Sequence, residues 1–157
     1  MMKNQHRYRQ SGATLVEMAI IAPVLLLILL SLIELSMMFF ATLTMQYAVR
    51  EGARYAITGQ SNLDPNTSSQ QRYAAVIASI QNNSLGMYAR LAPAISVNGT
   101  SYASTTYSNG MFGAAGSIIV LQLDCYWPVT TPFLSVLFTS GTYHFAVATT
   151  MRNEYFP

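Results

Sequence analysis

The sequence predicts an α+β fold in which a long N-terminal transmembrane helix precedes a small head with a second helix and an antiparallel sheet. Three observations predict it. A basic start is followed by a long apolar run, and sequence favourable to helix continues well beyond that run. A shorter amphipathic segment follows, with apolar residues three and four positions apart. Two segments near the C-terminus alternate between apolar and polar residues, which is typical of half-buried strands.

Composition excludes several functional classes. The 157 residues are 52% hydrophobic and only 9% charged, whereas soluble domains carry roughly 25% charge. The net charge of +2 and the lack of a Lys/Arg cluster after residue 12 argue against nucleic-acid binding. One cysteine and two histidines leave no material for an internal disulfide or a multi-cysteine zinc site. We therefore expect no metal and no cofactor.

The charges are concentrated at the N-terminus. Lys3, Arg7 and Arg9 precede an uncharged apolar run over residues 18–33, and the apolar character continues to Phe40. This run is long enough to cross roughly 30 Å of hydrocarbon. The positive-inside tendency predicts a cytoplasmic N-terminus and a translocated C-terminal part.

Three interpretations of the apolar run are open. A cleaved secretory signal has a shorter apolar region with a small-residue cleavage site after it, and no convincing site of this kind occurs here. A plain signal anchor would hold an exported domain. A prepilin-type leader would be cut on the cytoplasmic side, before the apolar segment. The third interpretation is favoured by Gly12, which lies five residues ahead of Glu17 where polar sequence meets apolar sequence.

A charged Glu17 side chain is energetically unfavourable in an apolar helix. A charged side chain costs on the order of 2.5–3.5 kcal/mol near the centre of a membrane helix, and less toward its ends. Cleavage after Gly12 would give Ala13 a positive amine, with which the carboxylate could pair in its own chain or in a neighbouring subunit. Such pairing at low dielectric would also set the axial register of stacked subunits.

The predicted helix is longer than the membrane is thick. From Ala13 to about Ile57 it would measure near 68 Å, with a bend expected at Pro23. We assign residues 1–12 to the leader and 13–40 to the transmembrane helix. Residues 41–58 would form a periplasmic extension of the same helix, and 59–157 a periplasmic head.

Glu34 and a later charged cluster are further candidate residues. Glu34 lies about 26 Å along the helix from Glu17, which fits either an interfacial acid or a contact between subunits that sets register. Arg50, Glu51 and Arg54 fall within five positions of a charge-poor chain. A solvated helix face would account for these residues, since surface ion pairs contribute little. We favour the alternative that the arginine stems pack beneath the head along a stripe with Leu43, Tyr47 and Ile57, and that the guanidinium groups reach strand carbonyls or Glu154.

The head begins with a loop and a helix. Residues 59–69 have loop composition, and Ser68 with Gln71 resembles a capping box. The helix that it would open ends near Asn83 and presents one apolar face formed by Tyr73, Val76, Ile77 and Ile80.

Strands dominate the rest of the head. Residues 95–98 lead into an Asn98-Gly99 turn, with 102–107 as the partner strand. Residues 117–127 and 142–152 are the strongest strand predictions. Between them a short helix is expected from Thr131-Pro132 through Phe138, ended by Gly141.

No active site emerges. Asp124, Cys125 and His144 lie on strand patterns, and chance composition accounts for them better than a nucleophile with its base. Cys125 is expected to be a buried free thiol; an intermolecular disulfide is the alternative. We predict no catalytic residue.

Four segments together resemble the TadE-like family, which comprises pseudopilins or minor pilins of the bacterial Flp/Tad tight-adherence pilus system. They are residues 12–23 (GATLVEMAIIAP), 33–35 (IEL), 48–56 (AVREGARYA) and, more weakly, 151–154 (MRNE). Met18 departs from the aromatic residue usual after the glutamate. The middle of the chain carries no motif of the family.

The resemblance implies a non-enzymatic component of a type IV-like pilus. It implies one cut by a prepilin peptidase between Gly12 and Ala13, with Glu17 as the processing and assembly glutamate. Its partners would be inner-membrane lipid, the peptidase, other pilin or pseudopilin subunits and the Tad assembly machinery. The protein would be located in the inner membrane, with its head in the periplasm, or in the extracellular pilus.

Two other functional classes are weighed against this one. An anchored exported binding or adaptor protein that never polymerises would use its tyrosine-rich head for adhesion or assembly. An anchored periplasmic hydrolase is disfavoured because the head contains few histidine and acidic residues.

Overall fold

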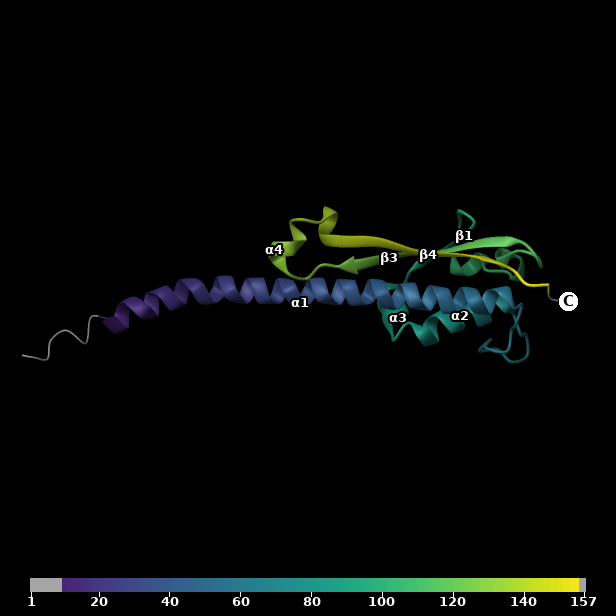
Figure 1. The fold of residues 1–157 in the computed structure, drawn as a ribbon, viewed down its shortest axis with the longest axis horizontal. Coiled ribbons are helices and arrows are strands. Elements are labelled where there is room, and N and C mark those ends of the chain that lie inside the picture. Colours follow the sequence, from purple (N-terminus) through teal and green to yellow (C-terminus); the bar gives the residue numbers. More distant parts are fainter. Residues whose placement is uncertain (1–9, 156–157) are drawn as a thin grey trace, which may run out of the picture.

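The computed structural model describes residues 10–155 and confirms the α+β fold (Figure 1). Most of the predicted leader, residues 1–9, lies outside the described residues, as do residues 156 and 157. The helices are α1 (Gln10–Ile57), α2 (Arg72–Asn83), α3 (Met87–Leu91) and α4 (Pro132–Ser135). The strands are β1 (Ala94–Val97), β2 (Thr100–Tyr102), β3 (Ile118–Pro128) and β4 (Thr142–Arg152). Short 3-10 turns lie at Ser104–Thr106, Asn109–Phe112 and Thr139–Gly141.

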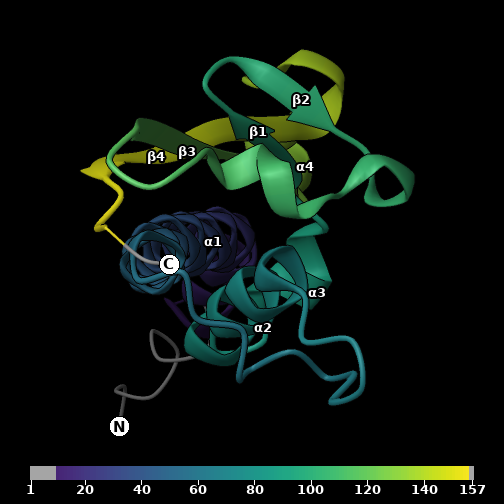
Figure 2. The same cartoon turned by 90° about the vertical axis from the view of Figure 1, so that its right-hand side faces the viewer.

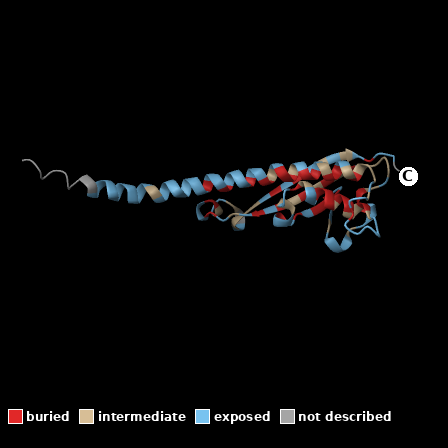
Figure 3. Cartoon of the chain, turned by 90° about the horizontal axis from the view of Figure 1, so that it is seen from below, coloured by how far each residue is buried: buried red, intermediate tan, exposed pale blue. Residues whose placement is uncertain are grey.

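Helix α1 is one continuous helix of 48 residues with Pro23 inside it. At 1.5 Å per residue it is about 70 Å long, as the sequence predicted. Figure 1 shows its N-terminal part curving away from the line of the rest of the helix. Figure 3 shows the N-terminal half of α1 exposed and the buried residues gathered in the C-terminal half, where the head packs against the helix. Residues 12–57 are long and apolar enough to cross a membrane.

The buried face of α1 is built from small residues. The sequence predicted a different packing face, the stripe with Leu43, Tyr47 and Ile57, and that prediction is wrong. Leu43 and Tyr47 are more than half exposed, and only Ile57 of the stripe packs against the core. Small side chains let a helix and a sheet approach the α1 backbone closely, which larger residues would prevent. The face consists of Ala41, Met45, Ala48, Val49, Gly52, Ala53 and Ala56, all buried.

The sheet and α2 lie on different sides of α1. Viewed nearly along α1, the sheet lies above the helix, and α2 and α3 lie below it (Figure 2). Helix α1 contacts α2, β3 and β4. It therefore supplies core to both halves of the head, and the two halves meet largely through it.

Helix α2 has the predicted apolar face. Val76 and Ile80 are fully buried, and Tyr73 and Ile77 pack against the core. Its predicted end at Asn83 is confirmed.

The predicted capping box at the start of α2 is wrong. The N-cap is Gln71, and its side chain makes no capping bond. Instead the Asp64 carboxylate accepts the backbone N–H of Gln71 at 2.6 Å, the N–H of Asn66 at 2.9 Å and the hydroxyl of Ser69 at 3.0 Å. These hydrogen bonds hold the pKa of Asp64 below its usual value. A carboxylate in the preceding loop thus organises the entry to α2.

The sheet is antiparallel with strand order β2-β1-β3-β4. Strands β3 and β4 pair over their whole length, from Ile118 opposite Arg152 to Pro128 opposite Thr142. Both strands agree closely with their predicted ranges. Alternate residues of β3 face the core, and this set comprises Ile119, Leu121, Leu123, Cys125 and Trp127.

The predicted turn at Asn98-Gly99 is confirmed. Both residues have positive φ, 52° and 79°, as a tight two-residue hairpin turn requires. The partner strand β2 ends at Tyr102, so the predicted partner over 102–107 is mostly wrong. The next residues form a 3-10 turn over Ser104–Thr106.

Gly52 is where α1 and α2 approach most closely. A Cβ at this position would lie 2.2 Å from Cγ1 of the buried Ile80. We predict that Gly52→Ala destabilises the head by about 1–3 kcal/mol through overpacking, although alanine has the higher helix propensity. Urea unfolding of the detergent-solubilised protein measures the change.

Gly110→Ala is the matched control. A Cβ there meets no atom within 4 Å, and no positive φ constrains the residue. Equal stability of the Gly52→Ala protein and the unsubstituted protein would contradict the close approach of the two helices.

Candidate functional site

The predicted processing residues lie on the first turns of α1. Gly12, Ala13 and Glu17 are all exposed. A side chain at Gly12 would meet nothing within 4 Å, and the head lies at the other end of the helix (Figure 1). The structure therefore leaves this segment open to an enzyme or to a neighbouring molecule.

Glu34 makes a contact that the sequence did not predict. Its Oε1 accepts the backbone N–H of Thr130 at 2.6 Å and the hydroxyl of the same residue at 3.0 Å. Its Oε2 accepts the backbone N–H of Thr131 at 2.7 Å. Glu34 is only 6% exposed, although the α1 residues on either side of it are exposed.

This contact fixes the connection between β3 and β4 against α1. Thr131 is the N-cap of α4, and Pro132 occupies its first turn. The first N–H groups of a helix have no partner within the helix, so an outside carboxylate stabilises them by hydrogen bonding. Glu34 thus satisfies backbone donors 96 and 97 residues further along the chain. We call these hydrogen bonds the Glu34 clasp.

The charged cluster near the end of α1 faces outward. Arg50 is exposed, and the side chain of Arg54 is 69% exposed. Arg54 Nη1 lies 3.3 Å from Glu51 Oε1 in an i, i+3 ion pair. The arginines therefore do not pack beneath the head as the sequence predicted. Arg54 and Glu51 instead line a shallow groove together with Glu154.

Arg72 takes the role that the sequence analysis gave to Arg50 and Arg54. It is buried, and its Nη2 donates to the Ala56 carbonyl at 2.6 Å, while Nη1 donates to the Gly113 carbonyl at 2.8 Å. The planar fork of guanidinium donors suits several carbonyls at once. Burial lowers the pKa of Arg72. One signal was in the sequence: Arg72 comes directly before an apolar helix face in a head with little charge.

Asn153 completes this buried polar cluster. Its Oδ1 accepts from Arg72 Nη2 at 3.2 Å, and its Nδ2 donates to the carbonyls of Phe112 and Ala114, both at 2.8 Å. The next residue, Glu154, donates its backbone N–H to the Ile57 carbonyl at 3.0 Å. The C-terminal segment 151–154 therefore closes onto the C-terminal end of α1.

Asp124, Cys125 and His144 do not form a reactive group. Strand alternation turns Cys125 into the core and Asp124 to the other face of β3. There Asp124 Oδ1 lies 3.5 Å from His144 Nε2. Burial, with a smaller contribution from Asp124, raises the pKa of Cys125 to about 12. The predicted buried free thiol is confirmed, and it stays protonated at neutral pH.

Comparison with known proteins identifies the N-terminal part of the chain. The family model described as TadE-like protein matches residues 12–54. This segment is TadE-like. The match begins at Gly12, ends at Arg54 and covers nearly all of α1, including Glu17 and Glu34. A search of curated proteins and a search of solved structures each found no match.

The TadE-like family is a family of pilus components and is generally non-enzymatic. The family match and the apolar helix are consistent with a membrane protein associated with the Tad pilus. Among residues 10–155, no group of three or more His, Cys, Asp or Glu side chains could hold a metal ion. The segment that matches the family is thus almost entirely α1.

The Glu34 clasp leads to a prediction about local stability. Glu34→Ala removes the acceptor of the backbone N–H groups of Thr130, which is exposed, and Thr131, which is buried, and an unpaired buried N–H costs about 1–3 kcal/mol. Hydrogen exchange at these two amides should therefore accelerate about 5- to 150-fold. Exchange measured on the full chain in detergent micelles, with peptides covering residues 129–137, tests this.

Glu51→Ala is the matched control, because it removes an acid on the same helix whose ion partner Arg54 is exposed. It should leave exchange in residues 129–137 unchanged. Unchanged exchange in Glu34→Ala would show that the clasp does not hold this segment.

Proposed function

We propose that the protein is a non-enzymatic minor pilin or pseudopilin of a Flp/Tad-type pilus. In this proposal α1 anchors it in the bacterial inner membrane, and a prepilin peptidase trims it between Gly12 and Ala13. The protein then acts in assembly of pili used for adherence. The observation that carries the proposal is the TadE-like match over 12–54, which falls on a helix whose N-terminal half is bare apolar surface.

Glu17 supports a role beyond anchoring. It is exposed on an otherwise apolar part of α1, where a carboxylate facing lipid is costly and a simple anchor gains nothing from it. In the proposal its partner is the new amine of Ala13, in its own chain or in an adjacent subunit. This pairing would stabilise one axial offset between neighbouring helices after the subunits have moved from the membrane into the filament.

The outer face of α1 supports contact with other subunits. Above the membrane segment, Leu43 and Tyr47 are 54% and 55% exposed on the side that the head does not cover. The Arg54–Glu51 pair lies further along the helix. Neighbouring pilin or pseudopilin helices would bury this face in an assembly.

The orientation follows from charge. The basic residues before Gly12 would stay in the cytoplasm, so the head would be periplasmic and would reach the cell exterior only within a pilus. The head carries three basic and three acidic residues from Tyr55 onward. A nearly neutral surface limits repulsion between copies of the head.

Processing gives the first test of the proposal. Protein recovered from membranes or sheared pili should begin at Ala13, and protein from a strain lacking the prepilin peptidase should begin at Met1. Gly12→Leu should block the cut in peptidase-positive cells. N-terminal sequencing reads all three. An intact Met1 on the unsubstituted protein in peptidase-positive cells would count decisively against the proposal.

Glu17→Gln gives the second test, because it keeps the size of the side chain and removes its charge. Membrane insertion should be normal or improved, and the number of assembled pili should fall steeply. Immunoblots of membranes and electron-microscopic pilus counts separate the two effects.

The control for that test is Glu51→Gln, whose side chain lies in an exposed ion pair. If the Glu17→Gln strain made as many pili as the unsubstituted strain, the Glu17 carboxylate would not set the axial register of the subunits. Normal pili in a strain lacking the whole protein, with adherence lost, would favour the non-polymerising adaptor instead.

A further inference from the structure

The connection between β3 and β4, residues 129–141, reaches further toward the N-terminus of α1 than any other part of the head (Figure 1). We call it the tip. The Glu34 clasp holds its start, while the far end of the β3–β4 hairpin reaches α1 at Ile57 through Glu154. The hairpin therefore extends along about 35 Å of the helix.

The position of the clasp sets the level of the tip. Glu34 lies 21 residues beyond Ala13, which is about 32 Å along a helix, and the hydrocarbon core of a bilayer is about 30 Å thick. With Ala13 at the cytoplasmic boundary, the tip lies at the outer boundary of the hydrocarbon. The head beyond it lies in water.

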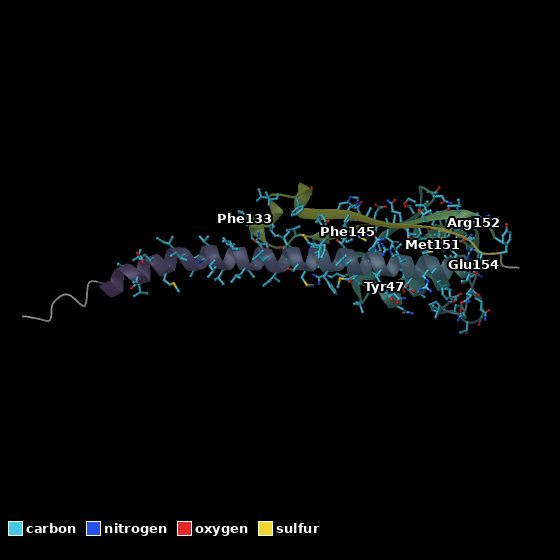
Figure 4. The ribbon with its side chains drawn as sticks, viewed as in Figure 1. Tyr47, Phe133, Phe145, Met151, Arg152 and Glu154 are labelled. Carbon is cyan, nitrogen blue, oxygen red and sulfur yellow. The ribbon has the colours of Figure 1, made fainter. Side chains whose placement is uncertain are left out.

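The tip exposes three large apolar side chains. Phe133, Val136 and Leu137 are 64%, 84% and 70% exposed. Figure 4 shows Phe133 at the end of the head nearest the N-terminal half of α1. No Lys, Arg, Asp, Glu or His occurs in residues 129–141. Large apolar side chains close together in water are unfavourable. The tip has no charged side chain of its own to resist entry into lipid, and the Glu34 carboxylate at its start is buried.

The backbone of the tip is largely satisfied from within. Val129 N–H donates to the Gly141 carbonyl, and Gly141 N–H donates to the Phe138 carbonyl. Ser135, Leu137 and Phe138 also donate their N–H groups to carbonyls of the tip. The Glu34 clasp takes the N–H groups of Thr130 and Thr131. Unpaired backbone groups are costly in apolar surroundings, so the pairing of these N–H groups lowers the cost of placing the tip there.

Aromatic side chains surround the base of the tip. Tyr143 lies edge-on to Phe138, with ring centroids 5.7 Å apart, and the half-exposed Tyr126 stacks on His144 at 4.7 Å. Tyrosine is enriched at the level of lipid headgroups, where its ring meets apolar chains and its hydroxyl meets water.

We propose that the tip inserts Phe133, Val136 and Leu137 into the outer leaflet of the membrane that α1 spans, as a second contact with lipid beside the helix. The proposal rests on the membrane anchoring of α1, to which the Glu34 clasp joins the tip. Two contacts with one bilayer restrict the tilt and rotation of the head. The Glu34 clasp sets the distance between them.

Fluorescence quenching in vesicles tests the insertion. The full chain with Val136→Cys, labelled with an environment-sensitive fluorophore, is reconstituted into phosphatidylcholine–phosphatidylglycerol vesicles. Cys125 is fully buried, so the unsubstituted chain serves as the labelling blank. The Val136 label should be quenched by lipids carrying a nitroxide near the headgroup, with iodide quenching reduced several-fold and emission shifted to the blue.

Two further labels serve as controls. Ile118→Cys places the label on a 64% exposed residue at the opposite end of β3, where iodide should quench it and lipid nitroxides should not. Leu27→Cys places it on the exposed apolar part of α1, where lipid nitroxides should quench it.

The outcomes separate the hypotheses. A Val136 label as accessible to iodide as the Ile118 label, beside a lipid-quenched Leu27 label, overturns the inserted tip and leaves the anchor intact. Failure of lipid quenching at Leu27 overturns the anchor itself. Shielding of Val136 that disappears as the protein-to-lipid ratio is lowered identifies a second copy as the occupant, which also overturns the proposal.

Discussion

The head depends on the small-residue face of α1. The sheet packs on one side of this helix and α2 on another, so neither side of the head has a complete core without it. Gly52 shows how tightly the constraint applies, because one added methyl group would overlap Ile80. Since the same helix continues as the bare apolar N-terminal half, the head and the segment long enough to cross a membrane belong to one continuous helix.

Two polar contacts fix the β3–β4 hairpin along α1. At one end the Glu34 carboxylate accepts backbone donors at the start of the tip. At the other end Arg72 and Asn153 join α2, the C-terminal segment and the last turn of α1. Each contact centres on a buried charged side chain, Glu34 or Arg72, whose hydrogen bonds are directional, so each favours one alignment of hairpin and helix.

The low charge of the chain has different physical causes in its different parts. In the N-terminal half of α1, bare apolar surface suits lipid or neighbouring helices, and Glu17 is an exception that a partner would have to compensate. In the head, the few charged groups are used for structure: Asp64 organises the entry to α2 and Arg72 bridges carbonyls. The protein as proposed works through surfaces in contact with lipid and subunits.

The sequence by itself determined the elements whose signals are local. The apolar length of α1, the alternation of β3 and β4 and the Asn98-Gly99 turn each depend on residues close together in the chain, as does the burial of Cys125. Only the tertiary structure decided which face of α1 is covered and where Glu34 and Arg72 find their partners. Those choices depend on the fit of small side chains and on donors up to 97 residues away, neither of which leaves a periodic pattern.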